Sequence, residues 1–129
     1  PLYNKCNQVT FMASTILDYL LELDGLHMNY EGAYWIKIEV RQVTPTLARP
    51  HGIRYSLSLH DGGNVRIMGF DNAHAVAASK GFKGKRFSYD HVHRSAEDQG
   101  TEYVFEGPEQ LLSDFWDEVE TTLTKVRGK

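Results

Sequence analysis

Hydrophobic and polar residues alternate with a period of two in two parts of the chain. In residues 26–40, apolar and charged positions alternate on either side of a Glu31-Gly32 turn. In residues 54–70, two alternating runs are joined by Asp61-Gly-Gly-Asn64, a composition typical of tight turns. Because successive side chains of a strand point to opposite faces, this pattern predicts two β-hairpins, each with one buried and one solvated face.

Both ends of the chain have the periodicity of an amphipathic helix. Ser14 is suited to cap a helix whose stripe of isoleucine and leucine ends at Asp24-Gly25. Pro108 is suited to the first turn of a second helix, in which apolar residues recur every three or four positions as far as Val126. Acidic residues near its start and basic residues near its end fit the helix dipole. We expect this helix to pack on a sheet through Leu112, Phe115, Trp116 and Val119.

The segments between these elements are less regular. A loop with two prolines, residues 44–50, ends the first hairpin. Residues 73–84 are rich in alanine and glycine and predict a mobile loop, whereas residues 87–93 and 103–105 predict two further strands. The pattern therefore predicts an α+β fold: an antiparallel five- or six-stranded sheet, with an N-terminal helix and a long C-terminal helix packed on one face. The other face would be free for a ligand.

Length and composition indicate one domain. The chain has 129 residues, of which 41% are hydrophobic and 12% aromatic, enough for one core but not for two domains. We expect the domain to span residues 12–129, since residues 1–11 precede Met12 and have the character of a leader or tag. The single cysteine, Cys6, excludes an internal disulfide and favours a reducing, cytoplasmic compartment. No apolar run approaches the roughly 18 residues that cross a bilayer, so no membrane partner is expected.

The densest group of residues that can carry chemistry is the run Tyr-Asp-His-Val-His-Arg at 89–94. On a strand, His91 and His93 project from the same face, about 6.6 Å apart along the backbone. This spacing suits either a metal half-site, with Asp71 or His74 as a further ligand, or acid–base chemistry near neutral pH. Because a carboxylate also orients a catalytic imidazole by hydrogen bonding, we expect acid–base chemistry with no metal and no cofactor. The candidate catalytic residues are His91, His93, Arg94, Asp90, Asp71 and His74.

A basic segment precedes this run. Residues 80–86 carry four cations and no acid, although the whole chain has a formal net charge of −3. Cations contact phosphates and interleaved aromatic rings stack on bases, so the composition indicates a contact for single-stranded nucleic acid; a solvated loop has the same composition. We expect RNA to be held there, close to the two imidazoles, by Lys80, Lys83, Lys85, Arg86, Phe82 and Tyr89.

Four blocks of the sequence resemble the TumE family of prokaryotic toxin components. They are Arg54-Tyr-Ser-Leu-Ser-Leu-His60-Asp61, Gly69-Phe-Asp-Asn-Ala-His74, Tyr89-Asp-His-Val-His-Arg94 and Glu109-Gln-Leu-Leu-Ser-Asp-Phe-Trp116. The blocks occur in the family's order, and the resemblance extends from about Met12 to the end of the chain. It implies a growth-inhibiting toxin whose partner is a small antitoxin protein, more directly than it implies a particular reaction.

We expect such a toxin to act on RNA as a metal-independent endoribonuclease. Attack by the ribose 2′-hydroxyl needs a base, an acid and cations for the developing charge. His91 and His93 would be base and acid in either order, with Arg94 and Lys85 or Arg86 for the charge, although Arg94 on a regular strand points to the opposite face. One alternative is a non-catalytic growth inhibitor that binds a protein or nucleic acid, and the third is a metal-dependent nuclease. Nucleotide-binding glycine loops and serine-hydrolase motifs do not occur, and the oligomeric state stays open.

Overall fold

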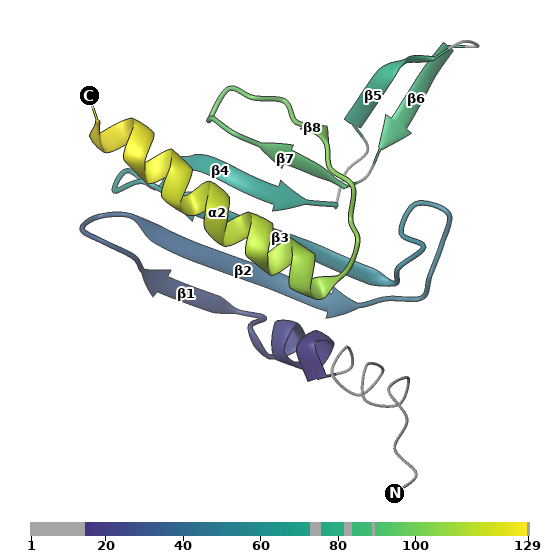
Figure 1. Ribbon diagram of the computed structural model, residues 1–129, viewed down its shortest axis with the longest axis horizontal. Coiled ribbons are helices and arrows are strands. Elements are labelled where there is room, and N and C mark those ends of the chain that lie inside the picture. Colours follow the sequence, from purple (N-terminus) through teal and green to yellow (C-terminus); the bar gives the residue numbers. More distant parts are fainter. Residues whose placement is uncertain (1–14, 73–75, 82–83, 89, 129) are drawn as a thin grey trace, which may run out of the picture.

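The main element of the fold is a six-stranded antiparallel sheet with the strand order β1-β2-β3-β4-β7-β8 (Figure 1). The computed structural model describes residues 15–72, 76–81, 84–88 and 90–128, and for residues 76–81 and 84–88 it describes the backbone alone. The strands of the sheet are β1 (Leu26–Asn29), β2 (Trp35–Gln42), β3 (Ile53–His60), β4 (Arg66–Asp71), β7 (His91–His93) and β8 (Thr101–Glu102).

The two helices and both hairpins agree with the sequence pattern. Residues 15–22 are helical, and the long helix α2 (Pro108–Arg127) crosses one face of the sheet (Figure 1). Strand β1 pairs with β2, and β3 pairs with β4. Glu31 and Gly32 both have a φ of 65°, the left-handed backbone that a tight hairpin turn requires. The predicted α+β fold with a five- or six-stranded antiparallel sheet is therefore confirmed.

The hydrophobic core lies between the sheet and α2. Alternate residues of the strands face the helix, and α2 contributes residues spaced three or four apart, as expected for its amphipathic pattern. The buried apolar residues are Leu20, Ile36, Ile38, Val40, Ile53, Tyr55, Leu57, Leu59, Met68, Phe70, Val92, Leu111, Leu112, Phe115, Val119 and Leu123.

Two sequence predictions about strands are wrong in their described parts. The mobile loop predicted at 73–84 contains β5 (Val76–Gly81), which pairs with β6 (Gly84–Ser88) as a separate antiparallel hairpin. Strand pairing uses backbone groups, so a segment outside the main sheet forms a ladder without the large apolar residues of a core strand. The single strand predicted at 87–93 is divided between β6 and β7, which belong to different sheets. The chain bends between them at Asp90.

Smaller differences concern the third predicted strand and one helix residue. The strand predicted at 103–105 lies two residues earlier, as β8, which pairs with His91 and Val92. Beyond it, the Tyr103 N–H bonds to the Asp90 carbonyl, where the chain bends and the regular pairing ends. Trp116, which we expected in the core, is only partly buried and packs at its margin, against Tyr30 and Phe115. Leu112, Phe115 and Val119 are buried as expected.

Candidate functional site on the open face of the sheet

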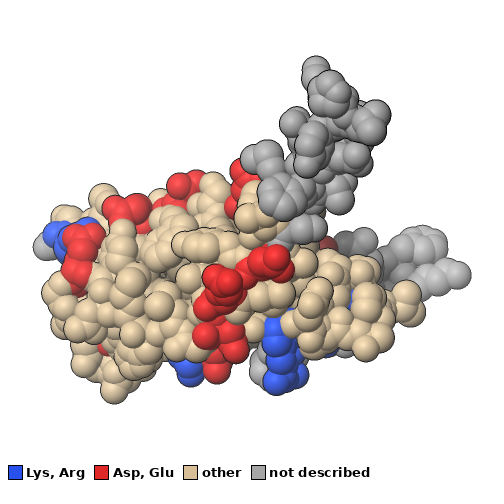
Figure 2. Space-filling view, turned by 90° about the horizontal axis from the view of Figure 1, so that it is seen from below, with Lys and Arg blue, Asp and Glu red and all other residues tan. Residues whose placement is uncertain are grey.

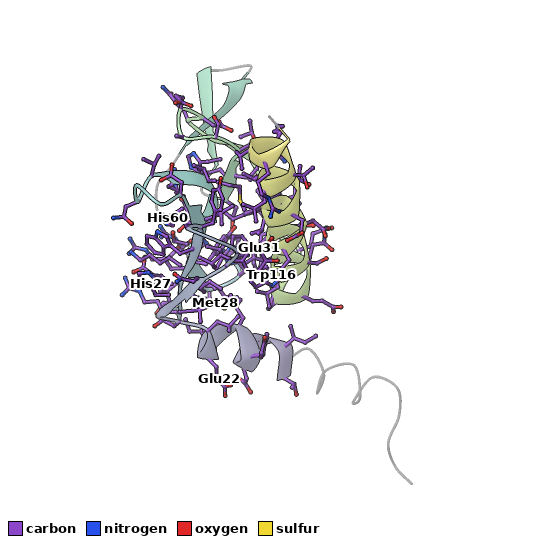
Figure 3. The ribbon with its side chains drawn as sticks, turned by 90° about the vertical axis from the view of Figure 1, so that its left-hand side faces the viewer. Glu22, His27, Met28, Glu31, His60 and Trp116 are labelled. Carbon is purple, nitrogen blue, oxygen red and sulfur yellow. The ribbon has the colours of Figure 1, made fainter. Side chains whose placement is uncertain are left out.

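The face of the sheet opposite α2, called the open face below, carries the polar residues that alternate with the core. In Figure 3 the side chains of His27 and His60 lie on the side of the sheet away from α2. The open face comprises His27, Trp35, Lys37, Glu39, Arg41, Arg54, Ser56, Ser58, His60, Gly69, Asp71, His91 and His93. It is the face that the sequence left free for a ligand.

Asp71, His91 and His93 form one cluster on this face. Strands β4 and β7 pair with Asp71 opposite His91 and Gly69 opposite His93, which brings the carboxylate between the two imidazoles. Asp71 Oδ1 lies 2.9 Å from His91 Nε2, and Asp71 Oδ2 lies 3.5 Å from His93 Nε2. All three residues are buried, with relative exposures of 6%, 2% and 7%. The expectation that His91 and His93 share a face is thus confirmed, with Asp71 as their neighbour.

The loop from Arg94 to Gly100 fixes the orientation of the imidazoles. His93 Nδ1 lies 2.8 Å from the main-chain oxygen of Asp98, and because a carbonyl only accepts, Nδ1 carries the hydrogen. The Asp98 carboxylate accepts hydrogen bonds from the backbone N–H groups of Arg94 and Gly100, which lower the pKa of Asp98. At Gly100, with a φ of 105°, a Cβ would lie only 2.9 Å from His91 Cδ2 and 3.0 Å from a carbon of His93. Only glycine fits this backbone against both rings.

The Asp71 carboxylate is held in its ionised form. Burial acts to raise the pKa of Asp71, but His91, then His93 and Arg66, act in the other direction, and the pKa is lowered overall. Arg66 Nη1 lies 3.3 Å from Asp71 Oδ2. The next residue, Asn72, bonds through its side chain to the backbone of Tyr55 and of Ile53, which fixes this end of β4. The cluster is therefore built from an anionic carboxylate on a rigid strand.

A hollow of about 370 Å³ lies beside the cluster on the open face. It is lined by Arg41 and Arg54, which are directly opposite each other on β2 and β3, and also by two carboxylates, those of Asp24 and Glu39. Ser56, another lining residue, is the pairing partner of Asp71. The hollow and the cluster therefore adjoin, and an anion held by the two arginines would lie near the imidazoles.

A column of three stacked rings extends the open face towards β1. Trp35 is stacked between His27 and His60, with ring centroids 4.0 Å and 4.1 Å away. His60 Nε2 also lies 2.8 Å from Ser58 Oγ. In the view from below, by contrast, acidic side chains are the main charged groups (Figure 2). The open face thus carries a column of aromatic rings in addition to its two arginines.

His60 should make stability depend on pH. Burial, with a smaller contribution from Lys37 and Arg66, lowers the pKa of His60, so below about pH 6.5 the unfolded chain binds the proton more readily than the folded one. Stability is then present above that pH and is lost as the pH falls through the lowered pKa. We expect the free energy of unfolding to fall between pH 7 and pH 5, and to fall less in His60→Asn. Denaturant titrations at both pH values would measure this, and equal losses in the two proteins would contradict it.

Two predicted site residues do not join the cluster. Arg94 points to the helix side, where its Nε lies 3.3 Å from Glu118 Oε1 of α2. Asp90 belongs to a separate group, in which it accepts a hydrogen bond from the Tyr55 hydroxyl at 2.9 Å and lies 3.1 Å from His51 Nε2. Burial and Asp90 raise the pKa of Tyr55, so its hydroxyl stays protonated and donates. This group holds the bend between β6 and β7.

The remaining predicted residues are described in part or not at all. Lys80, Lys85 and Arg86 lie on the β5–β6 hairpin, where Lys80 pairs with Lys85 and Ser79 pairs with Arg86. This hairpin projects away from the main sheet (Figure 1). The other four predicted residues lie outside the described part of the chain: His74, Phe82, Lys83 and Tyr89.

Several residues of the site were missed by the sequence reading. Arg66 reaches the cluster from strand β4, and Asp98 and Gly100 reach it from the loop after β7. No pattern of spacing in the sequence predicts these contacts. Arg41 and Arg54 did have a signal, because each takes a solvated position in a predicted strand, but their register was unknown. Sequence alone therefore gave the core of the cluster and not its surroundings.

The fold and the site define a small α+β protein with a carboxylate–imidazole centre on the open face of an antiparallel sheet. The family model described as Toxin TumE matches residues 28–123, and the chain belongs to this family. The resemblance seen in the four sequence blocks is thus confirmed, and the chain is a toxin component of a toxin–antitoxin system with an antitoxin as its partner. No curated protein and no solved structure matches the chain. Within its described part, no helix is both long and apolar enough to span a membrane.

Proposed function

We propose that this toxin acts on RNA as an endoribonuclease whose reaction centre is the Asp71–His91–His93 cluster. The observation that carries the proposal is the convergence of two imidazoles on one buried carboxylate, at distances of 2.9 Å and 3.5 Å. Histidine exchanges protons near neutral pH, and a neighbouring carboxylate sets its orientation and charge. Such a centre suits a reaction in which protons move to and from oxygen atoms.

The reaction would be cleavage through the ribose 2′-hydroxyl. The 2′-oxygen bonds to phosphorus while the bond from phosphorus to the 5′-oxygen breaks, which leaves a cyclic phosphate and a 5′-hydroxyl. One proton leaves the 2′-hydroxyl for a base and another reaches the 5′-oxygen from an acid. Our sequence prediction gives these roles to His91 and His93. Arg66, which lies at the cluster, replaces Arg94 as the cation for the developing phosphate charge.

The arginine pair beside the cluster supports an RNA substrate. Like charges directly opposite each other on adjacent strands are unfavourable, and Arg41 and Arg54 form such a pair. A backbone phosphate between the two guanidinium groups would remove this repulsion. The Trp35 column supplies aromatic surface on the same face, and ring stacking is a common way to hold single-stranded bases.

Incubating the full chain with total RNA tests the proposal directly. We expect discrete cleavage products, with growth arrest in cells that express the chain without its antitoxin. A parallel reaction with EDTA separates metal-free from metal-dependent cleavage. Growth arrest with intact RNA would overturn the proposal and would favour the alternative of a non-catalytic inhibitor that binds its target.

RNA binding should weaken as salt rises, and cationic residues should set the slope. Each phosphate contact removed should reduce the slope of log affinity against log salt by about 0.7 for a single strand. We expect this reduction in Arg41→Gln/Arg54→Gln, and also in a variant that neutralises Lys83, Lys85 and Arg86, which tests the predicted basic segment. Fluorescence anisotropy with a labelled oligonucleotide at several salt concentrations would measure both. An unchanged slope would remove that group from the binding surface.

A further inference from the structure

The spacing of the cluster is that of a metal site. One potential ligand atom from each of Asp71, His91 and His93 lies within 4.8 Å of the other two, and all three residues are buried. Ligands held about 2.0–2.2 Å from a tetrahedral metal ion lie roughly 3.3–3.6 Å from one another. The observed separations of 2.9 Å and 3.5 Å between the carboxylate oxygens and the imidazole nitrogens are close to that range. Small side-chain movements would complete the geometry.

The orientation of His93 presents a ligand atom to the carboxylate. Its Nδ1 hydrogen is directed to the Asp98 carbonyl, which leaves Nε2 as the ring atom that faces Asp71. A charge-assisted hydrogen bond is about 2.7–2.9 Å long, and the 3.5 Å between His93 Nε2 and Asp71 Oδ2 exceeds it. This separation matches that of two ligands of one tetrahedral metal ion.

The second carboxylate oxygen supports the same conclusion. Asp71 Oδ1 is buried and has no hydrogen-bond partner among the described residues, although His91 Nε2 lies only 2.9 Å away. A buried charged acceptor without a hydrogen bond is costly, and coordination of a cation would satisfy it. We infer that Asp71, His91 and His93 form a binding site for a divalent transition-metal ion.

The donor set indicates which ions are suitable. Two imidazole nitrogens and one carboxylate oxygen match Zn²⁺, Mn²⁺ or Fe²⁺, whereas Mg²⁺ and Ca²⁺ prefer oxygen ligands throughout. Three protein ligands leave at least one coordination position for water or for an oxygen of the substrate. A bound ion would supply Lewis-acid chemistry at a substrate phosphate, and its two histidine ligands would then not serve as the base and the acid of the metal-free reaction.

The surroundings of the three ligands also fit a metal site. A ligating histidine usually donates its second ring hydrogen to a carbonyl or carboxylate, as His93 does to Asp98. Gly100 lets the loop pack directly on both imidazoles and so limits their movement. Arg66 contacts Asp71 Oδ2 and competes with a metal ion for that oxygen, which leaves Oδ1 as the better ligand atom. A dication next to Arg66 would make the centre strongly attractive to a phosphate.

Calorimetric titration of the chelator-treated full chain with Zn²⁺ or Mn²⁺, without RNA, tests the inference. We expect one ion per chain, with Mg²⁺ binding much more weakly. Asp71→Asn preserves the shape of the side chain but removes its charge, and it should weaken binding by about 100-fold or more, since losing even an outer partner of a ligand costs 10- to 100-fold. His51→Asn is the matched control, because it disrupts another close His–Asp pair, and its affinity should equal that of the wild type.

Failure to bind Zn²⁺ or Mn²⁺, or unchanged affinity in Asp71→Asn, would overturn the metal site. If Asp71→Asn does not fold by circular dichroism, His93→Gln replaces it, and Co²⁺ absorption of the wild type reports directly on nitrogen and oxygen ligands. The inference uses the cluster on which the proposed function rests, but it does not require RNA as the substrate. Metal binding without RNA cleavage would overturn the proposed function alone. Cleavage that survives EDTA, in a chain that binds no metal, would overturn the metal site alone.

Discussion

Replacing either His91 or His93 with asparagine is expected to lower RNA cleavage by roughly 100- to 10,000-fold, the usual contribution of a general acid or base. Both imidazoles contact the Asp71 carboxylate, so removing one disables the centre whether the ring transfers a proton or holds a metal ion. Asparagine retains a polar side chain at these buried positions. Single-turnover rates with a labelled RNA would measure the loss, and circular dichroism would show that the variants fold.

His51→Asn is the control for this experiment. His51 also pairs with a carboxylate, that of Asp90, but it lies outside the cluster, so its loss should leave the cleavage rate nearly unchanged. If the cluster variants arrest growth and cleave RNA as well as the wild type does, the cluster is not the reaction centre. A bell-shaped pH–rate profile without metal would support the predicted base and acid roles, with apparent pKa values that belong to the pair.

The hairpins and α2 could be predicted because each repeats one simple pattern over many residues. In β2 and β3 the alternation of apolar and polar positions gives one buried face and one solvated face. In α2 the spacing of Leu112, Phe115 and Val119 gives one buried stripe. Residues 73–88 could not be predicted in this way, because β5 and β6 pair with each other outside the main sheet and need no apolar face towards α2.

Only the part of the cluster that depends on spacing within one strand could be predicted from the sequence. His91 and His93, two residues apart on a strand, necessarily share a face, and Asp71 was a candidate because it ends the preceding strand. The pairing of Asp71 with His91 is a long-range contact, and so is the approach of Gly100 to both rings. Local sequence carries no information about such contacts.

Asp90 and Arg94 are residues that the sequence wrongly placed with the two histidines. They flank the two histidines in the sequence, and proximity along the chain suggested a shared site. The bend at Asp90 and the alternation of β7 instead direct them to other partners, namely Tyr55 for Asp90 and Glu118 for Arg94. Neighbours in a strand are therefore poor candidates for one site unless they are two residues apart.

Replacing Phe115 with alanine is expected to reduce the free energy of unfolding by about 3–5 kcal/mol, the usual loss for a fully buried aromatic residue. Phe115 has no exposed surface and lies edge-to-face against Phe70, with ring centroids 6.2 Å apart, so it joins α2 to the centre of the sheet. Alanine would leave a cavity between the two layers that the backbone of α2 and β4 cannot close. Urea titration monitored by far-ultraviolet circular dichroism would measure the change.

Trp116→Ala is the matched comparison, because the two residues are adjacent on α2 and both are aromatic. Trp116 is only partly buried, so less apolar surface returns to water, and we expect a loss of about 1–2 kcal/mol. If Trp116→Ala costs as much as Phe115→Ala, the tryptophan belongs to the core as its spacing first indicated. If both cost less than about 1 kcal/mol, α2 does not pack on the sheet as described. The larger loss at Phe115 follows from its central position between α2 and β4, which helical spacing alone does not distinguish from that of Trp116.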